Sequence, residues 1–230
     1  IAISLFLHLQ SWRTADLDDL YHFRHAWIYR TQGLLDSSFP WVQYSVIQEA
    51  GADLWYGFHL LLAPFTYIKD PFLALKIASA TVTAAGVLLA FFSLKRLKIK
   101  WPHLWTILFF TSSPSLFYRL SALRPQLFSF GLSFLFLAYF FRPSTDRRKN
   151  LAVFFLLSLA GAWVHSALSW VNFVIFAVGS LVEKRFGKKL RCKEFLAMIG
   201  GTLIGFILRP HPFQGLKLIY VQLVQNSIEE

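Results

Sequence analysis

Long apolar runs separated by short polar breaks make up most of the chain beyond residue 53. They predict transmembrane helices at residues 72–94, 101–112, 126–141, 151–164, 168–182 and 195–208, and residues 1–9 are interpreted as the outer end of one more. Because a span of the hydrocarbon core needs about 20 apolar residues, several of these helices are short for a full crossing. The pattern predicts an all-α, polytopic membrane helix bundle, whose short helices are sheltered by neighbouring protein.

Residues 14–33 differ from these runs because they gather acids, histidines and arginines. Thr14 or Asp16 is predicted to cap a helix whose first turn holds Asp18 and Asp19, where free backbone N–H groups favour negative charge. Helical spacing predicts an apolar face of Leu17, Leu20, Tyr21, Trp27 and Ile28, and a polar face of Asp18, His22, His25 and Tyr29. The segment is predicted to lie along the membrane surface. The alternative for each single residue is that the acid only caps the helix and that the histidine only faces solvent.

Two further stretches extend this polar region. Residues 34–53 mix Pro, Gly, Ser and acids, and they predict a long extracytoplasmic loop. Residues 54–68 are apolar but too short to span the bilayer, so they predict a second amphipathic, interfacial helix.

Composition agrees with a membrane protein. Hydrophobic residues make up 56% of the chain, 25 of the 230 residues are Phe, and the mean hydropathy is +0.50, which is too apolar for a soluble domain. Cys192 is the single cysteine, which excludes a disulfide framework and a thiol metal site.

The net charge of +11 follows from the basic loops and does not indicate nucleic acid as a partner. Of the 23 Lys and Arg residues, 14 lie at residues 95–100, 142–149 and 184–193, between apolar runs. Such basic loops are typical of the cytoplasmic side. The predicted helices then alternate in direction, and residues 14–68 lie outside. The chain also begins without Met inside an apolar run, so residues 1–230 are expected to be the N-terminal part of a longer transmembrane domain, truncated at both ends.

This topology collects polar residues on the extracytoplasmic side. They are Asp16, Asp18, Asp19, His22, Arg24, His25, His59, Arg119, Arg124, His165, Arg209, His211 and Lys217. Arginines there are not explained by the positive-inside bias, and a planar guanidinium suits bidentate binding of phosphate. The alternatives are snorkelling of Arg119 and Arg124 to lipid headgroups, and a simple helix stop at Arg209 and His211.

Carboxylates on one helix and arginines on facing turns form a chemically sensible pair. A carboxylate accepts a proton or holds a divalent cation, while cations hold an anionic leaving group. No Walker A loop, G-x-S-x-G elbow, H-E-x-x-H or EF-hand motif is present. His22 and His25 are three residues apart and could face one metal ion, without further clustered ligands in the sequence.

The segment D-D-L-Y-H-F-R, which begins at Asp18, resembles the D-P-Y-Y-H-L-R type motif in the first extracytoplasmic loop of GT-C fold glycosyltransferases such as oligosaccharyltransferase catalytic subunits. Asp18, Tyr21, His22 and Arg24 match the motif, whereas Asp19 replaces the usual proline and Leu20 an aromatic residue. The order of a short aromatic helix, a span ending in basic residues, and a Ser-Pro turn with two arginines is similar to protein O-mannosyltransferases and lipid A aminoarabinose transferases. The resemblance covers the architecture of about residues 1–220 and few specific residues.

The resemblance implies transfer of a sugar from a polyprenyl-phosphate or polyprenyl-pyrophosphate donor to a glycan, lipid or protein acceptor on the extracytoplasmic face. It implies Asp18 as the general base or metal-binding carboxylate, assisted by Asp16 or Asp19. Since members of the group differ in metal use, Mg²⁺ or Mn²⁺ at Asp18 is an optional cofactor. Position and chemistry assign the donor phosphate to Arg119, Arg124, Arg209 and His211, with His22, Arg24 and His59 in support.

Two other functions remain open. A transporter or flippase for an anionic lipid would need ionisable residues inside the spans, and the sequence offers only Lys76 and His103 near span ends. A non-catalytic membrane subunit would use the outer loop as a docking surface.

Overall fold

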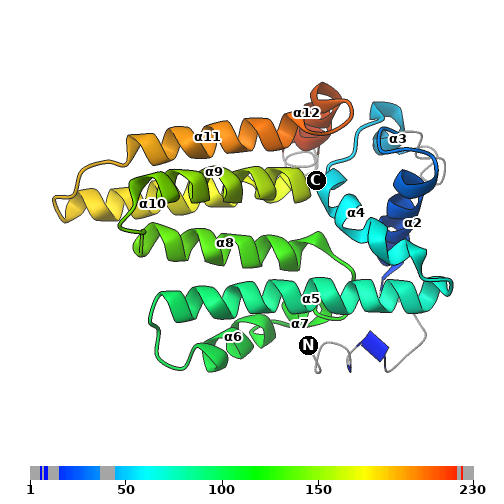
Figure 1. The fold of residues 1–230 in the computed structure, drawn as a ribbon, viewed down its shortest axis with the longest axis horizontal. Helices are drawn as coiled ribbons and strands as arrows, with labels where there is room; N and C mark the ends of the chain where they lie inside the picture. Colours follow the sequence, from blue (N-terminus) through cyan, green and yellow to red (C-terminus); the bar gives the residue numbers. More distant parts are fainter. Residues whose placement is uncertain (1–5, 7, 10–15, 37–44, 222–223, 225–230) are drawn as a thin grey trace.

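The described residues of the computed structural model are 6, 8–9, 16–36, 45–221 and 224, and among them the regular structure is helical, with no strand. The prediction of an all-α fold is confirmed for this part of the chain. Five helices lie as neighbouring rods (Figure 1): α5 (Pro71–Arg96), α8 (Pro125–Phe141), α9 (Arg147–Val164), α10 (Trp170–Arg185) and α11 (Cys192–Ile207). The predicted span at residues 1–9 and the capping residue Thr14 lie, apart from residues 6, 8 and 9, outside the described residues.

Shorter elements cover one side and one end of these rods. The α6 helix (Pro102–Thr111) lies beside α5, and α7 (Pro114–Arg119) packs against α6. One end, here called the α2 end, carries α2 (Leu17–Thr31), α3 (Val46–Ala50), α4 (Tyr56–Leu62) and the 3₁₀ turn η1 (Ala63–Tyr67). A second 3₁₀ turn, η2 (Ser166–Leu168), joins α9 to α10, and α12 (Pro212–Tyr220) follows α11.

The helix starts follow from local sequence. Each of α5, α6, α7, α8 and α12 begins with proline, whose fixed φ suits the first turn and whose missing N–H is not needed there. Aspartates cap others: the Asp70 carboxylate accepts from the N–H groups of Phe72 and Leu73, and Asp146 caps α9 in the same way. Turn chemistry therefore sets these boundaries close to the predicted ones.

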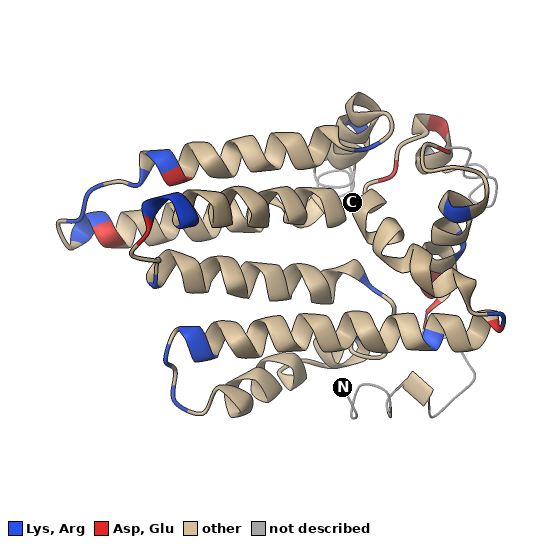
Figure 2. Cartoon of the chain, in the orientation of Figure 1, with Lys and Arg blue, Asp and Glu red and all other residues tan. Residues whose placement is uncertain are grey.

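Cross-contacts fix the directions of the rods. Ser133 in α8 donates to the Asn172 side-chain oxygen of α10 (3.1 Å), and Phe140 packs against Phe176 with centroids 5.4 Å apart, so α8 and α10 run in the same direction. Short loops turn the chain back before and after α9, which therefore runs the opposite way. The basic loops gather at the end of the rods away from α2 (Figure 2), and this end is called the basic end.

Within the described residues, two segments are long and apolar enough to cross a membrane, Pro71–Arg96 and Ser166–Arg185. They coincide with the predicted spans at residues 72–94 and 168–182. The helix Pro125–Phe141 is apolar but shorter. The predicted spans at residues 101–112, 151–164 and 195–208 also form helices, and these fall short of the criterion in length or composition.

Most of the polar face predicted for α2 is turned into the protein. Leu17 is 80% exposed and Leu20 is 44% exposed, whereas His22, His25 and Tyr29 of the supposed polar face are buried. These polar side chains are buried because they meet polar partners from the segment before α4 and from α4 itself. Helical periodicity alone counts a histidine as polar and cannot foresee such partners.

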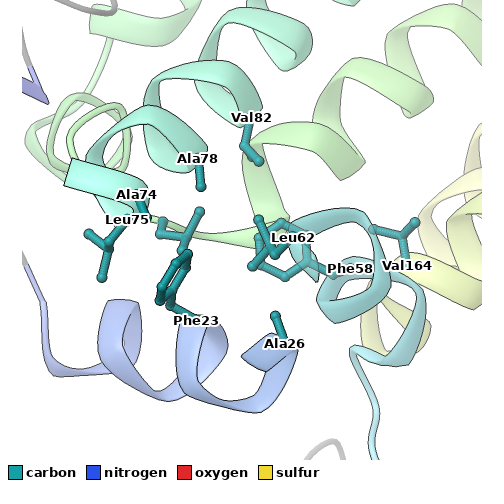
Figure 3. Close-up of a cluster of buried hydrophobic side chains, with 10 residues drawn as sticks. Phe23, Ala26, Phe58, Leu62, Ala74, Leu75, Ala78, Val82 and Val164 are labelled. Carbon is teal, nitrogen blue, oxygen red and sulfur yellow. The ribbon is translucent and has the colours of Figure 1, made fainter. Parts of the chain in front are cut away.

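Apolar packing holds α2 against the bundle. Phe23 and Ala26 of α2 pack with Phe58 and Leu62 of α4, and the same cluster continues along α5 through Ala74, Leu75, Ala78 and Val82 (Figure 3). Since these residues come from three helices, the cluster fixes the orientation of α2 and thereby of its first turn.

The α9 and α11 helices touch through backbone. A methyl group added at Gly201 would overlap the Phe155 carbonyl group, and one added at Gly205 would overlap the Leu159 carbonyl group. These glycines lie four residues apart, as do their partners, so the two helices are parallel and unusually close. The neighbouring Gly200 is different, because an added Cβ would meet only the Phe155 ring, at 3.7 Å.

We expect Gly205→Ala to destabilise the protein by about 1–3 kcal/mol, because the added methyl group forces α11 away from α9. Gly200→Ala is the control, and it should be neutral or stabilising, since Ala favours the helix by roughly 0.5–1 kcal/mol over Gly. Thermal unfolding midpoints of the purified proteins measure both. Equal effects of the two substitutions would contradict the close approach at Gly205.

Candidate functional site

A cavity of about 520 Å³ opens at the α2 end of the bundle. Its walls come from α2, α3, the segment before α4 and the start of α8, namely Leu17, Asp18, Leu20, Tyr21, His22, Arg24, Ile47, Trp55, Arg124 and Gln126. Four residues of the predicted site, Asp18, His22, Arg24 and Arg124, therefore line one cavity. Tyr21, Trp55 and Gln126 are lining residues that the sequence did not mark as candidates.

Arg124 bridges two carboxylates at the rim of this cavity. Its Nη1 donates to Asp18 Oδ2 and its Nη2 to Asp16 Oδ2. Arg124 precedes Pro125, which keeps its backbone extended just ahead of α8 and directs the residue towards α2. The bridge thus joins segments more than 100 positions apart, and Asp18 remains the more exposed acid, at 52% against 21% for Asp16.

Asp19 holds the two sides of the Arg124 bridge in place. Its side chain is buried, Oδ1 accepts from the Leu123 N–H (2.8 Å), and Oδ2 accepts from the Asp16 N–H (3.3 Å). Asp16 in turn caps α2 by accepting from the Asp18 N–H, which confirms the predicted cap. Asp19 therefore positions Arg124 through the adjacent peptide and does not line the cavity.

A buried hydrogen-bonded chain leads inward from the cavity. His22 Nδ1 lies 2.8 Å from His59 Nε2, and His59 Nδ1 lies 2.6 Å from Asp53 Oδ2. The Tyr29 hydroxyl also donates to Asp53 Oδ2 (2.8 Å), while the Trp55 N–H donates to Asp53 Oδ1 (2.8 Å). The chain connects the cavity wall to an interior carboxylate through two imidazoles.

Burial and this carboxylate set the protonation states. Burial lowers the pKa of His22 well below its usual 6.5, and the neighbouring His59 lowers it further. Burial likewise lowers the pKa of His25 to about 3. Burial alone would raise the pKa of Asp53, but the interaction with His59 holds that pKa well below its usual value. At neutral pH, His22 and His25 are neutral and Asp53 is ionised.

Arg209 is a structural residue in this fold, and its predicted contact with a donor phosphate is not supported. It is 5% exposed, and its guanidinium donates to Ser166 Oγ (3.0 Å), to the carbonyl oxygens of Asp53 and Leu54 (3.4 Å each) and to that of Ala162. These acceptors use the donors that a phosphate would need.

Three further candidates lie away from the cavity wall. Arg119 ends α7 half-buried, His211 is an exposed residue in the left-handed conformation ahead of α12, and His59 is fully buried behind His22. In the part of the chain that the structure describes, Arg119 makes no ion pair. Burial, with a smaller contribution from the charge of Arg119, lowers the pKa of His165 to about 4.

A second cavity, of about 690 Å³, lies on the other side of Arg24. It shares Leu20 and Arg24 with the first cavity, and Arg30 and Lys69 add two more cations to its wall. The Arg24 guanidinium stacks over Trp27 (4.0 Å) and that of Arg30 over Tyr67 (4.7 Å), which orients both groups.

Asp16 and Asp18 have the right chemistry for Mg²⁺ or Mn²⁺, because two carboxylates together with substrate phosphate form a common site for these ions. In this structure Arg124 already contacts one oxygen of each carboxylate and supplies the positive charge. A second group, His25, Asp53 and His59, offers nitrogen and oxygen donors that lie within 4.8 Å of one another. Asp53 was not among the candidates from the sequence, although a lone acid ahead of an aromatic run was the available signal.

Comparison with known proteins gave no match to a family model, to a curated protein or to a solved structure.

We expect Arg124→Gln to destabilise the protein by about 1 kcal/mol at neutral pH, because it removes a partly buried double ion pair. The effect should depend on pH. Burial raises the pKa of Asp16, but hydrogen bonding and charge from Arg124 outweigh it and leave the pKa below its usual 3.8. A lowered native pKa stabilises the fold above the unfolded value, and this contribution is lost as pH falls through the native value.

Thermal unfolding from pH 7 to pH 3 therefore tests the ion pair. The difference in unfolding midpoint between wild type and Arg124→Gln should be constant above about pH 5 and should shrink below the usual pKa of Asp16. Arg119→Gln is the matched control, and its gap should stay small at every pH. A gap for Arg124→Gln that does not narrow in acid would contradict the role of Asp16.

Proposed function

We propose that this chain is part of a polytopic membrane glycosyltransferase that moves a sugar from a polyprenyl-phosphate or polyprenyl-pyrophosphate donor to an acceptor on the extracytoplasmic side. The observation that carries this proposal is the cavity in which Asp18 and Arg24 of the D-D-L-Y-H-F-R segment meet Arg124 from the Ser-Pro turn region. These are the elements on which the resemblance to GT-C fold enzymes rests.

Surface composition supports a membrane location. Large apolar side chains point outward along α10 and α11, including Leu181 (67% exposed) and Leu203 (57% exposed). Only 28% of the apolar window in Ser166–Arg185 is buried inside the protein, so its remaining surface suits lipid better than water.

The distribution of charge supports the orientation. The loops after α5, α8 and α10 bring their basic residues to the basic end, while α2 lies at the opposite end with its two aspartates and its N-cap Asp16 (Figure 2). By the positive-inside rule, the basic end is cytoplasmic and the cavity is extracytoplasmic. The alternating directions of α8, α9 and α10 agree with this arrangement.

The chemistry of the cavity supports a displacement reaction. Asp18 accepts the proton of an acceptor hydroxyl, whose oxygen attacks the anomeric carbon of the donor sugar. The bond from that carbon to the phosphate oxygen breaks, and its electron pair leaves with the phosphate. Arg124 and Arg24 stabilise the charge that develops on the leaving phosphate. Apolar wall residues such as Leu17 and Ile47 suit the lipid part of the donor.

We expect Asp18→Asn to lower turnover by roughly 100-fold or more, since an amide cannot accept the proton. The assay uses the full-length protein in membranes and follows release of polyprenyl phosphate from labelled polyprenyl-linked sugars. Asp16→Asn breaks the other half of the Arg124 bridge, so a much smaller loss in that variant separates base chemistry from loss of the ion pair. Asp146→Asn, at the basic end, controls for general effects of replacing a helix-capping acid.

Three outcomes count against this proposal. Equal turnover by wild type and Asp18→Asn removes Asp18 from the mechanism. Absence of turnover by the wild type across the common donors contradicts the enzyme class. Transport of a labelled anionic lipid by the reconstituted wild type and Asp18→Asn alike would favour a flippase.

A further inference from the structure

Three polar side chains with metal-binding atoms meet behind the cavity, one each from α2, from the segment leading into α4 and from α4 itself. They are His25, Asp53 and His59, each no more than 2% exposed. His59 Nδ1 lies 2.6 Å from Asp53 Oδ2, and His25 Nε2 lies 3.8 Å from the same oxygen. One donor atom from each residue falls within 4.8 Å of the other two. Two imidazoles and one carboxylate of this kind form a common ligand set for first-row metals.

The surroundings favour a cation at this point. An ionised carboxylate in the interior is costly unless a charge compensates it. Arg209 contacts the backbone of Asp53: its guanidinium donates to the Asp53 carbonyl oxygen, at 3.4 Å. The remaining titratable groups around the carboxylate are His22, Tyr21, Tyr29 and Tyr56, and Tyr29 donates to it. In the metal-free protein His59 offsets this charge, and a divalent ion bound to both residues would take over that role.

The far sides of two of these ligands are already held in place. His22 bonds His59 on the nitrogen away from Asp53 (2.8 Å), and the Trp55 N–H donates to Asp53 Oδ1 (2.8 Å). Outer hydrogen bonds of this type orient ligands in metal sites and raise their affinity. The Tyr29 hydroxyl, 2.8 Å from Asp53 Oδ2, is a further oxygen close to the same point.

We propose that His25, Asp53 and His59 bind a divalent first-row transition metal, Zn²⁺ foremost, as a structural ion that joins α2 to α4 and to the segment before α4. Mg²⁺ and Ca²⁺ suit two imidazole ligands poorly, because these ions favour shells made of oxygen ligands. His59 would coordinate as a neutral imidazole: Nδ1 gives up its proton to face the ion together with Asp53 Oδ2, and Nε2 carries a proton that it donates to His22 Nδ1. This site does not rest on the proposed transferase activity, since a transporter or a structural subunit would hold the ion equally well.

The first experiment measures metal in the purified, tag-free protein by elemental analysis, without added metal. About one equivalent of zinc per chain is expected. Removal by a chelator should lower the thermal unfolding midpoint, and stoichiometric Zn²⁺ should restore it. Co²⁺ in place of Zn²⁺ should give the visible absorption of a low-symmetry nitrogen and oxygen site. None of these readings depends on sugar transfer.

Variants locate the ion. His25→Gln, Asp53→Asn and His59→Gln should each lose the metal and the response to chelator. His22→Gln keeps all three ligands and should weaken affinity by roughly 10–100-fold. His165→Gln is the matched control, because His165 is also buried but bonds Ser129 instead, and it should keep a full equivalent.

The result that overturns the proposal needs no variant. If the native protein is metal-free, and if added Zn²⁺ or Co²⁺ neither binds nor raises the unfolding midpoint, the cluster is a hydrogen-bonded network alone. Equal metal content in wild type and in all three ligand variants would also place the ion elsewhere.

Discussion

The buried carboxylate of Asp53 is the interaction on which the α2 end of the molecule depends. It accepts hydrogen bonds from the Tyr29 hydroxyl, from His59 and from the Trp55 N–H, while the backbone carbonyl of the same residue accepts from Arg209. One position therefore ties α2, α4 and the end of α11 together. Since a buried charge without partners costs several kcal/mol, these elements are held where they satisfy it.

Most of the fold could be predicted because local signals and apolar runs coincide. Prolines and capping aspartates mark helix starts, and the apolar runs after residue 70 each became a helix within a few positions of the predicted bounds. The α3 helix was missed, since its five residues within a polar loop carry no periodic signal. The burial of His22, His25 and Tyr29 on the polar face of α2 was not foreseen, because amphipathic periodicity treats polar residues as facing water. In this fold three of them find Asp53 and its neighbours instead.

The candidate site was predictable in type more than in detail. Asp18, Arg24 and Arg124 meet at one cavity as their charges and shared side suggested, whereas Arg209 satisfies backbone carbonyls in the interior. Sequence alone cannot separate these two fates of an arginine, since both place a long cation at a helix end. The role of Asp53 was hidden for a related reason: a buried acid is recognisable only once its partners from other segments are known.

The glycine contact between α9 and α11 also fixes the position of a residue at the α2 end. Gly201 and Gly205 lie against the backbone of Phe155 and Leu159, one turn apart. Arg209, two residues beyond the end of α11, donates to the Ala162 carbonyl oxygen of α9. A shift of α11 by one residue would rotate the end of the helix by about 100° around its axis. The Arg209 guanidinium would then move away from its carbonyl acceptors. The register between α9 and α11 therefore determines where the Arg209 guanidinium lies at the α2 end.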